Sequence, residues 1–213
     1  MNDRSMIDRS TNDRHRGDRR VLRSDSPDLA ALEAGGWRVV ARSWAAALDT
    51  ATADRGRLEL LVERARTVAG IRELTPADAD AVLALDAATL DDYPGDVATA
   101  HAPLTAAEAV PHPGRRGWGA LEGDGRLVAM TFLAPAAEVT EATETDFTVV
   151  ADGWRGLGLG SAVKAAAVLA LMGEGVERFR TGGAAENVAS LAANRAVGYV
   201  VDEEWLTLAP PEA

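Results

Sequence analysis

Glycines cluster at residues 149–162, where an apolar segment runs into a second one with helical spacing. The stretch reads Val-Val-Ala-Asp-Gly-Trp-Arg-Gly-Leu-Gly-Leu-Gly-Ser-Ala, with Gly156, Gly158 and Gly160 at alternate positions. A strand that turns through glycines into a helix aims several unpaired backbone N–H groups at one point, where the helix dipole favours negative charge. The stretch therefore predicts a bound phosphate or pyrophosphate and, behind it, a nucleotide-like cofactor.

Two familiar phosphate motifs do not fit this stretch. The Walker pattern needs Gly-Lys-Ser/Thr, but Lys164, the only lysine in the chain, lies too far into the following helix. The dinucleotide fingerprint needs GxGxxG, and the spacing here is GxGxG. For the isolated motif, the alternative is that the glycines only let the helix pack tightly against the strand.

Composition narrows the function classes. The chain has 213 residues, 47% of them hydrophobic, a net charge of −11, three histidines and no cysteine. A disulfide or thiolate site is excluded and a multi-histidine metal site is disfavoured, so we expect no metal. The acidic balance argues against nucleic-acid binding. No run approaches the roughly 18 apolar residues of a membrane span, and no secretory signal is visible, so we expect a cytoplasmic protein without membrane association.

The chain divides into three parts. Residues 1–20 repeat Asp-Arg every five residues with few apolar side chains, which predicts a disordered tail. Residues 21–69 predict a helix–strand–helix extension, and residues 70–213 predict a mixed α/β domain. In that domain we expect strands at 71–74, 118–122, 126–133, 138–150, 176–181 and 199–208, and helices at 76–90, 161–172 and 187–197.

The extension contains a short segment that weakly repeats the spacing of a later one. Leu29 precedes Gly36 by the same interval that separates Leu191 from Gly198, and each glycine precedes a strand-like run containing a tryptophan. This repeat is either chance or the remnant of a duplicated domain. Because an apolar strand needs a partner, we expect the extension to pack onto the main domain or across a homodimer interface.

Several segments together resemble the GNAT acyltransferase superfamily. Residues 155–160 fit its R/Q-x-x-G-x-G/A signature. Residues 181–187 and 194–199 are similar to its T-x-N-A-x-x-N and N-x-x-x-G-F segments, and residues 146–150 to the end of its central strand. The resemblance covers residues 70–208 and implies a GNAT-like fold, an α+β arrangement on a mixed sheet.

The resemblance implies acetyl-CoA as co-substrate and assigns residues to it. Val149 and Val150 would pair with the pantetheine arm, and backbone N–H groups would hold the pyrophosphate. Asn187 maps to an asparagine that often bonds the CoA arm, although asparagine also favours a helix N-cap. The bend residues implied to bind pyrophosphate are Arg155, Gly156, Leu157, Gly158, Leu159, Gly160 and Ser161.

Amine acylation needs a base and a stabilised oxyanion. A backbone N–H near Val149 or Val150 can stabilise the oxyanion. Strand alternation places Glu144, Asp146, Thr148 and Val150 on one face. Asp146 is the first candidate for the base and Glu144 the second. The alternative is that these acids only line an acidic substrate mouth or face solvent.

The sequence departs from the family pattern at two positions. Asn194 stands where many members have a tyrosine that acts as general acid, which leaves the proton donor unassigned, with solvent as one alternative. Gly183 replaces the first asparagine of the T-x-N segment, so a polar contact is missing. We expect Tyr93 and His101 at the acceptor pocket, core positions for Trp118 and Tyr199, and a surface loop position for His112.

We interpret the chain as an N-acetyltransferase that moves an acetyl group from acetyl-CoA to the amine of a small molecule by direct attack in a ternary complex. The negative charge favours a cationic acceptor. A protein N-acetyltransferase is an alternative within this class. The rival from another class is a catalytically silent CoA-binding or assembly module, supported by the absent tyrosine and the unexplained first 69 residues.

Overall fold

The computed structural model describes residues 19–94, 96–136 and 141–211. Residues 1–18 of the predicted tail and residues 138–140 of one predicted strand lie outside this part of the chain. The strands form one mixed sheet in the order β1-β8-β2-β7-β6-β5-β4-β3. Their bounds are β1 Arg20–Arg23, β2 Arg38–Asp49, β3 Gly70–Glu73, β4 Arg116–Leu121, β5 Leu127–Ala134, β6 Thr143–Val150, β7 Arg178–Ala184 and β8 Val200–Ala209.

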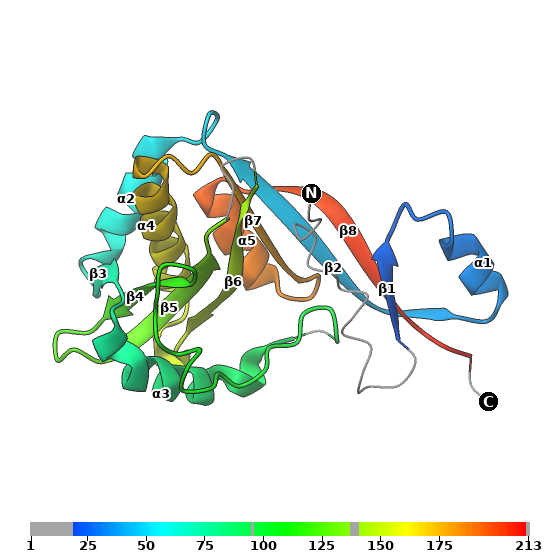
Figure 1. Cartoon of the computed structure of the whole chain (residues 1–213), viewed down its shortest axis with the longest axis horizontal. Helices are drawn as coiled ribbons and strands as arrows, with labels where there is room; N and C mark the ends of the chain where they lie inside the picture. Colours follow the sequence, from blue (N-terminus) through cyan, green and yellow to red (C-terminus); the bar gives the residue numbers. More distant parts are fainter. Residues whose placement is uncertain (1–18, 95, 137–140, 212–213) are drawn as a thin grey trace.

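Helices cover both faces of the sheet. On one face α4 packs across β3, β4, β5 and β6, with α2 and α5 against it, and on the other face α3 packs on β5 and β6 (Figure 1). The α-helices are α1 Leu29–Ala34, α2 Arg55–Ala65, α3 Ala79–Thr89, α4 Leu159–Gly173 and α5 Val188–Val197. This arrangement confirms the predicted mixed α/β class.

Local sequence signals explain several of these boundaries. Thr75 and Asp78 form a reciprocal capping box just ahead of α3. Gly125, with φ of +91°, closes the hairpin between β4 and β5. The Asn187 side chain accepts a hydrogen bond from the Ser190 backbone N–H at the start of α5, and Gly198, with φ of +114°, ends that helix.

The N-terminal extension is built into the sheet. Strand β2 lies between β7 and β8 and is antiparallel to both, so it bridges two strands from the far end of the chain. Helix α2 packs on α4. Strand β1, helix α1 and the adjoining parts of β2 and β8 extend away from the rest of the molecule as an arm, residues 20–42 and 205–209 (Figure 1). The origin of the extension in a duplicated domain stays a prediction.

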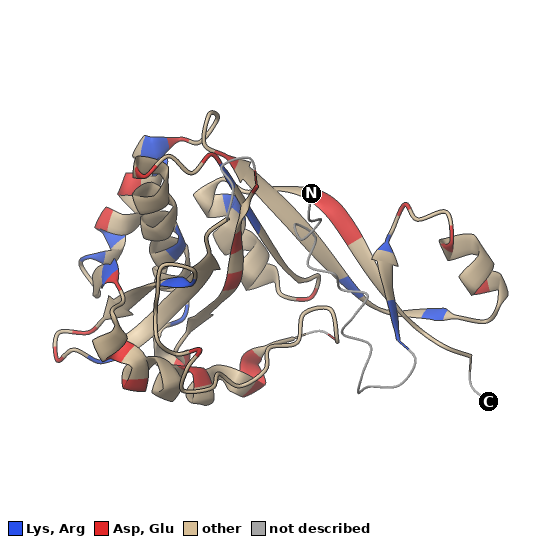
Figure 2. Cartoon of the chain, viewed as in Figure 1, with Lys and Arg blue, Asp and Glu red and all other residues tan. Residues whose placement is uncertain are grey.

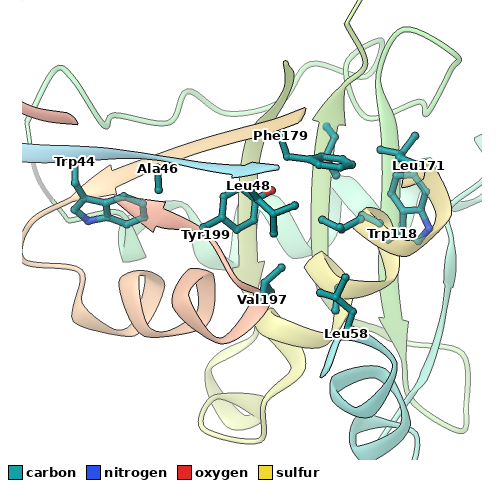
Figure 3. Packing of buried hydrophobic residues seen from close by; sticks show 13 residues of the cluster. Trp44, Ala46, Leu48, Leu58, Trp118, Leu171, Phe179, Val197 and Tyr199 are labelled. Carbon is teal, nitrogen blue, oxygen red and sulfur yellow. The ribbon is translucent and has the colours of Figure 1, made fainter. Parts of the chain in front are cut away.

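The largest buried cluster joins the extension to the main domain. Figure 3 shows Trp44 and Leu48 of β2 on the side of the sheet where Val197 of α5 lies. Trp118 and Tyr199 are each 3% exposed and belong to this cluster, as predicted for both. Burial of the apolar side chains of β2 therefore anchors the extension.

Charged residues occur along most of the described elements. Acidic residues are spread over helices, strands and loops (Figure 2). Within the described residues, no helix combines the length and apolarity needed to cross a bilayer. The same residues contain no cluster of three or more acidic or histidine side chains arranged to hold a metal ion.

Candidate active site

A cavity opens where two parallel strands separate. Strands β6 and β7 pair only at Thr143–Phe179 and Glu144–Arg180. Beyond these pairs the strands part, and a cavity of about 380 Å³ lies between them. Thr145, Asp146, Phe147 and Thr148 of β6 line it, so the edge of β6 that faces β7 is open to a ligand.

The hydrogen bonds of β6 decide which backbone groups face that ligand. The Ala151 N–H donates to the Val128 carbonyl on β5. Because backbone groups alternate between the two edges of a strand, Val149 also directs its groups at β5, whereas Val150 and Thr148 face the open edge. The Val150 carbonyl accepts a hydrogen bond from Arg155 Nε at 3.3 Å. Of the two valines predicted to pair with the cofactor, Val150 alone has its backbone open to it.

A bulge in β6 overturns the predicted side-chain alternation. The register with β5 changes from Phe132–Phe147 to Leu133–Thr145, which makes Asp146 the extra residue. Thr148 then contacts Lys164 on the α4 side of the sheet. The expectation that Asp146 shares a face with Thr148 and Val150 is therefore wrong.

The two predicted carboxylates have different surroundings. One oxygen of Asp146 accepts hydrogen bonds from Arg115 Nη2 at 2.8 Å and Nε at 3.0 Å. The Arg115 guanidinium stacks on the Phe132 ring, 4.4 Å from its centroid, on the α3 side of the sheet. Glu144 is half-buried and does not line the cavity. Asp146 thus reaches the cavity as half of an ion pair.

The glycine bend forms a cradle of backbone N–H groups. Gly156 and Gly158 have φ of +75° and +79°, which glycine adopts without strain. Gly158 caps α4 without any side-chain hydrogen bond, so the first N–H groups of the helix, from Leu159 to Ser161, point outward. A Cβ added to Gly156 or Gly158 would meet no atom within 4 Å, whereas one added to Gly160 would lie 3.4 Å from Val150 Cγ2. The bend therefore has room for a phosphate, and it packs against the open end of β6.

Side chains of the bend contribute little to this cradle. The Arg155 guanidinium forms ion pairs with Asp92 and with Asp152. Leu157 is exposed and Leu159 is buried in the core beneath the bend. A bound pyrophosphate would accordingly be held by the backbone, as the sequence predicts.

Three buried polar atoms line the cavity without a hydrogen-bond partner. They are the hydroxyl oxygens of Ser43 and Tyr93 and the Oδ1 of Asn194. An unpaired buried polar group costs about 1–3 kcal/mol, so these atoms indicate a polar ligand. Asn187 lines the same cavity while its side chain caps α5, which confirms the cap and leaves the cofactor contact a prediction.

A histidine–aspartate pair lies on the α3 side of the cavity. His101 Nε2 lies 2.6 Å from Oδ1 of Asp86, which is 2% exposed, and the second oxygen of Asp86 accepts from the Leu104 N–H. The imidazole is sandwiched between the rings of Tyr93 and Phe147, at centroid distances of 4.5 and 4.7 Å. An ionised carboxylate only accepts hydrogen bonds, so this contact suits the tautomer that carries the proton on Nε2.

The sequence missed Asp86 and the role of Lys164. Asp86 lies in helix α3, 15 residues before His101, and no sequence motif predicts their contact. Lys164 lines the cavity, although its position far into α4 speaks against a Walker lysine. The unusual placement of the chain's only lysine among apolar helix residues is the one signal that points to it.

The missing asparagine at Gly183 has a packing explanation. A Cβ added at Gly183 would lie 2.8 Å from Trp44 Cζ2. The Trp44 indole, whose Nε1 donates to the Ala184 carbonyl at 3.2 Å, occupies the space that a side chain would need. Ser43 and Trp44 thus make β2 a wall of the cavity.

Comparison with known proteins identifies the fold. No family model matches the chain, and no curated protein matches its sequence. Among solved structures, a GCN5-related N-acetyltransferase from Sphaerobacter thermophilus matches with a TM-score of 0.65 and 16% identity, covering 91% of this chain and 60% of that one. One from Kribbella flavida matches with a TM-score of 0.61 and 19% identity, covering 92% and 68%. A tandem GNAT protein from the clavulanic acid biosynthesis pathway matches with a TM-score of 0.59 and 19% identity, covering 89% and 62%.

These matches confirm the predicted resemblance at the level of the fold. The chain has the GNAT fold, with a mixed sheet that opens between two parallel strands. It spans between 60% and 68% of the length of the three structures named above.

Proposed function

We propose that the protein transfers an acetyl group from acetyl-CoA to the amine of a small molecule by direct attack in a ternary complex. One observation carries the proposal: the open edge of β6 leads from the glycine bend at Val150 to the cavity at Thr148. A pyrophosphate on the bend would place the pantetheine arm along this edge and the thioester in the cavity. The unpaired N–H groups and the open space at Gly156 and Gly158 fit such a ligand.

We propose His101 as the base that takes the proton from the acceptor amine. Its ring lines the cavity, and Asp86 fixes the tautomer that leaves a basic nitrogen. Asp146, the first candidate from sequence, is engaged by Arg115, and Glu144 lies outside the cavity wall. On this proposal Asp146 and Arg115 position the acceptor.

The acceptor is proposed to be a small cationic amine. Glu108 and Asp146 both line the cavity on the side of His101. Arg115 is the guanidinium on the same wall, and its ion pair is made with Asp146. Arg115 also acts electrostatically on the Glu108 carboxylate, which accepts hydrogen bonds from the hydroxyl and N–H of Thr105. Two carboxylates therefore share one guanidinium on this wall, and the remaining negative charge would attract a substrate ammonium group.

Binding and turnover test the proposal separately. Calorimetry should detect binding of CoA, and release of CoA from acetyl-CoA should accelerate with at least one member of a panel of amines. Binding without turnover on any amine or peptide N-terminus would support the silent CoA-binding module instead. The absence of CoA binding at millimolar ligand would reject both.

Two matched variants test the base. We expect His101→Gln to lower kcat by about 10²–10⁴-fold, the usual contribution of general acid–base catalysis, with CoA affinity retained. We expect Asp146→Asn to act mainly on KM for the acceptor. The reverse pattern would return the base to Asp146.

We further propose that the arm mediates formation of a homodimer. Val40, on the part of β2 in the arm, is 45% exposed, and Figure 1 shows the arm standing clear of the rest of the molecule. Sedimentation velocity measures the oligomeric state directly. A monomer at all accessible concentrations would reject the dimer.

A further inference from the structure

The only lysine of the chain lies buried at the point where β6 and β7 separate. Lys164 projects from α4 and is 4% exposed. Its Nζ lies 3.4 Å from the hydroxyl of Thr148, and 3.5 Å from those of Thr145 and Thr181. The amine therefore touches both parting strands and lines the cavity between them.

No acid compensates this amine. Within the described part of the chain Lys164 forms no ion pair, and its other polar neighbour is the ring of Tyr199, 5.5 Å from Nζ. Glu144 acts electrostatically on Tyr199, whereas burial is the cause that lowers the pKa of Lys164, to about 7. The amine is thus in a state to exchange a proton near neutral pH.

An amine at this position is costly unless something uses it. The other buried side chains of α4 are apolar apart from one serine, so an apolar residue would suit this face of the helix. A buried cation that lacks a counter-ion destabilises the fold. The three hydroxyls satisfy its hydrogen bonds only at long distances of 3.4–3.5 Å. A partner that becomes negative during a reaction would explain the arrangement.

We propose that Lys164 is the proton donor to the CoA thiolate that leaves when the thioester is cleaved. This inference rests on the acetyl transfer proposed above. It fills the gap left by Asn194, whose side-chain amide lines the cavity but is not an acid.

The step balances with groups already placed in the cavity. The acceptor ammonium first loses a proton to solvent. Its neutral nitrogen then bonds to the thioester carbonyl carbon and loses a second proton to His101. The carbon–sulfur bond breaks with its electron pair on sulfur, and the Lys164 ammonium gives sulfur one proton. Solvent removes the proton from His101 and restores the one on Lys164 after the products leave. Burial lowers the pKa of this amine toward the range of a thiol, about 8.5, so the proton can pass from the ammonium to the thiolate.

The single lysine allows a direct test on the wild-type protein. Protein labelled with ¹³C-lysine gives one lysine side-chain resonance, whose shift follows the ionisation of Lys164. We expect CoA to raise the proton affinity of Lys164 by at least about tenfold, because a thiolate beside an ammonium stabilises it. Desulfo-CoA, which lacks only the sulfur, should leave the proton affinity of Lys164 unchanged. An equal response to the two ligands would overturn the proposal.

Two variants separate proton donation from a structural role. Lys164→Met should lower kcat by about 10²–10³-fold, with little change in KM for acetyl-CoA. Lys164→Arg keeps the charge but holds its proton too tightly to donate it, so it should be equally slow. Recovery of kcat in the arginine variant would show that charge alone suffices and would overturn the proposal.

Two further measurements complete the test. Mass spectrometry after incubation with acetyl-CoA alone should find Lys164 unmodified, and its acetylation would make it an acyl acceptor and overturn the proton-donor role. Calorimetry with CoA and desulfo-CoA keeps the two proposals distinct. If neither ligand binds, the proposed function fails; if both bind and the lysine resonance does not distinguish them, only the role of Lys164 fails.

Discussion

Replacing Lys164 with methionine should stabilise the folded protein at neutral pH and flatten its pH dependence. Methionine has similar length and no charge. Burial lowers the pKa of Lys164 from 10.5 to about 7 in the folded protein. Between these values the unfolded chain binds one more proton than the folded one, so wild-type stability falls as the pH falls from about 10.5, and the loss is complete below about 7.

The size of the effect follows from the two pKa values. The full loss in the free energy of unfolding is about 5 kcal/mol. About 3 kcal/mol of it is lost as the pH falls from about 9.5 to about 7. Loss of the contacts to the three threonine hydroxyls adds an offset that does not depend on pH. Burial raises the pKa of Tyr93 and of Tyr199, so both cost stability above about pH 10, but they do so equally in the two proteins.

Urea unfolding measures this difference. The free energy of unfolding of each protein is determined at several pH values from about 6 to about 9.5. The advantage of Lys164→Met should shrink as the pH rises, approaching about 1.4 kcal/mol per pH unit above pH 7. A difference that stays constant within about 0.5 kcal/mol across this range would show that the amine is not depressed by burial, and would refute the reasoning.

Three further substitutions test the site. Asp86→Asn should lower kcat by about tenfold or more, because the cavity histidine loses the carboxylate that fixes its tautomer; steady-state kinetics with unchanged CoA affinity by calorimetry checks this. Gly158→Ala should cost about 1 kcal/mol through its φ of +79° and weaken CoA binding, whereas Gly173→Ala, at the end of α4 with open space around it, should be neutral or stabilising in the same unfolding assay. Gly183→Asn should cost about 1–3 kcal/mol because its Cβ meets Trp44, and combining it with Trp44→Ala should cost less than the sum of the two single changes in a double-mutant cycle.

Features governed by neighbouring residues were predictable from sequence. The glycine bend, the caps of α5 and the hairpin at Gly125 each depend on a few adjacent side chains and their backbone preferences. The strand and helix order from residue 70 onward follows from hydrophobic spacing in the same way. The bulge at Asp146 was not predictable from hydrophobic spacing. A bulge is set by pairing with β5, and it reverses the face of the sheet on which a side chain lies.

The placement of the extension also depended on distant partners. The run from Trp37 to Leu48 was predictable as a strand that needs a neighbour, but its position between β7 and β8 was not. Its two neighbours are strands from the far end of the chain, and no local pattern encodes that pairing. Trp44 occupies the space beside Gly183. This contact explains why glycine replaces the family's asparagine there, a difference that the sequence shows but does not explain.

The sequence by itself determined the backbone cradle and predicted a phosphate ligand for it, since both depend on residues within one short stretch. The tertiary structure alone decided which side chains meet around the cavity. His101 and Asp86 come from a loop and a helix, and Lys164 meets threonines of two parting strands. Side chains this far apart in the chain are brought together by packing of the whole sheet and its helices, and burial then changes their chemistry in ways that spacing does not encode.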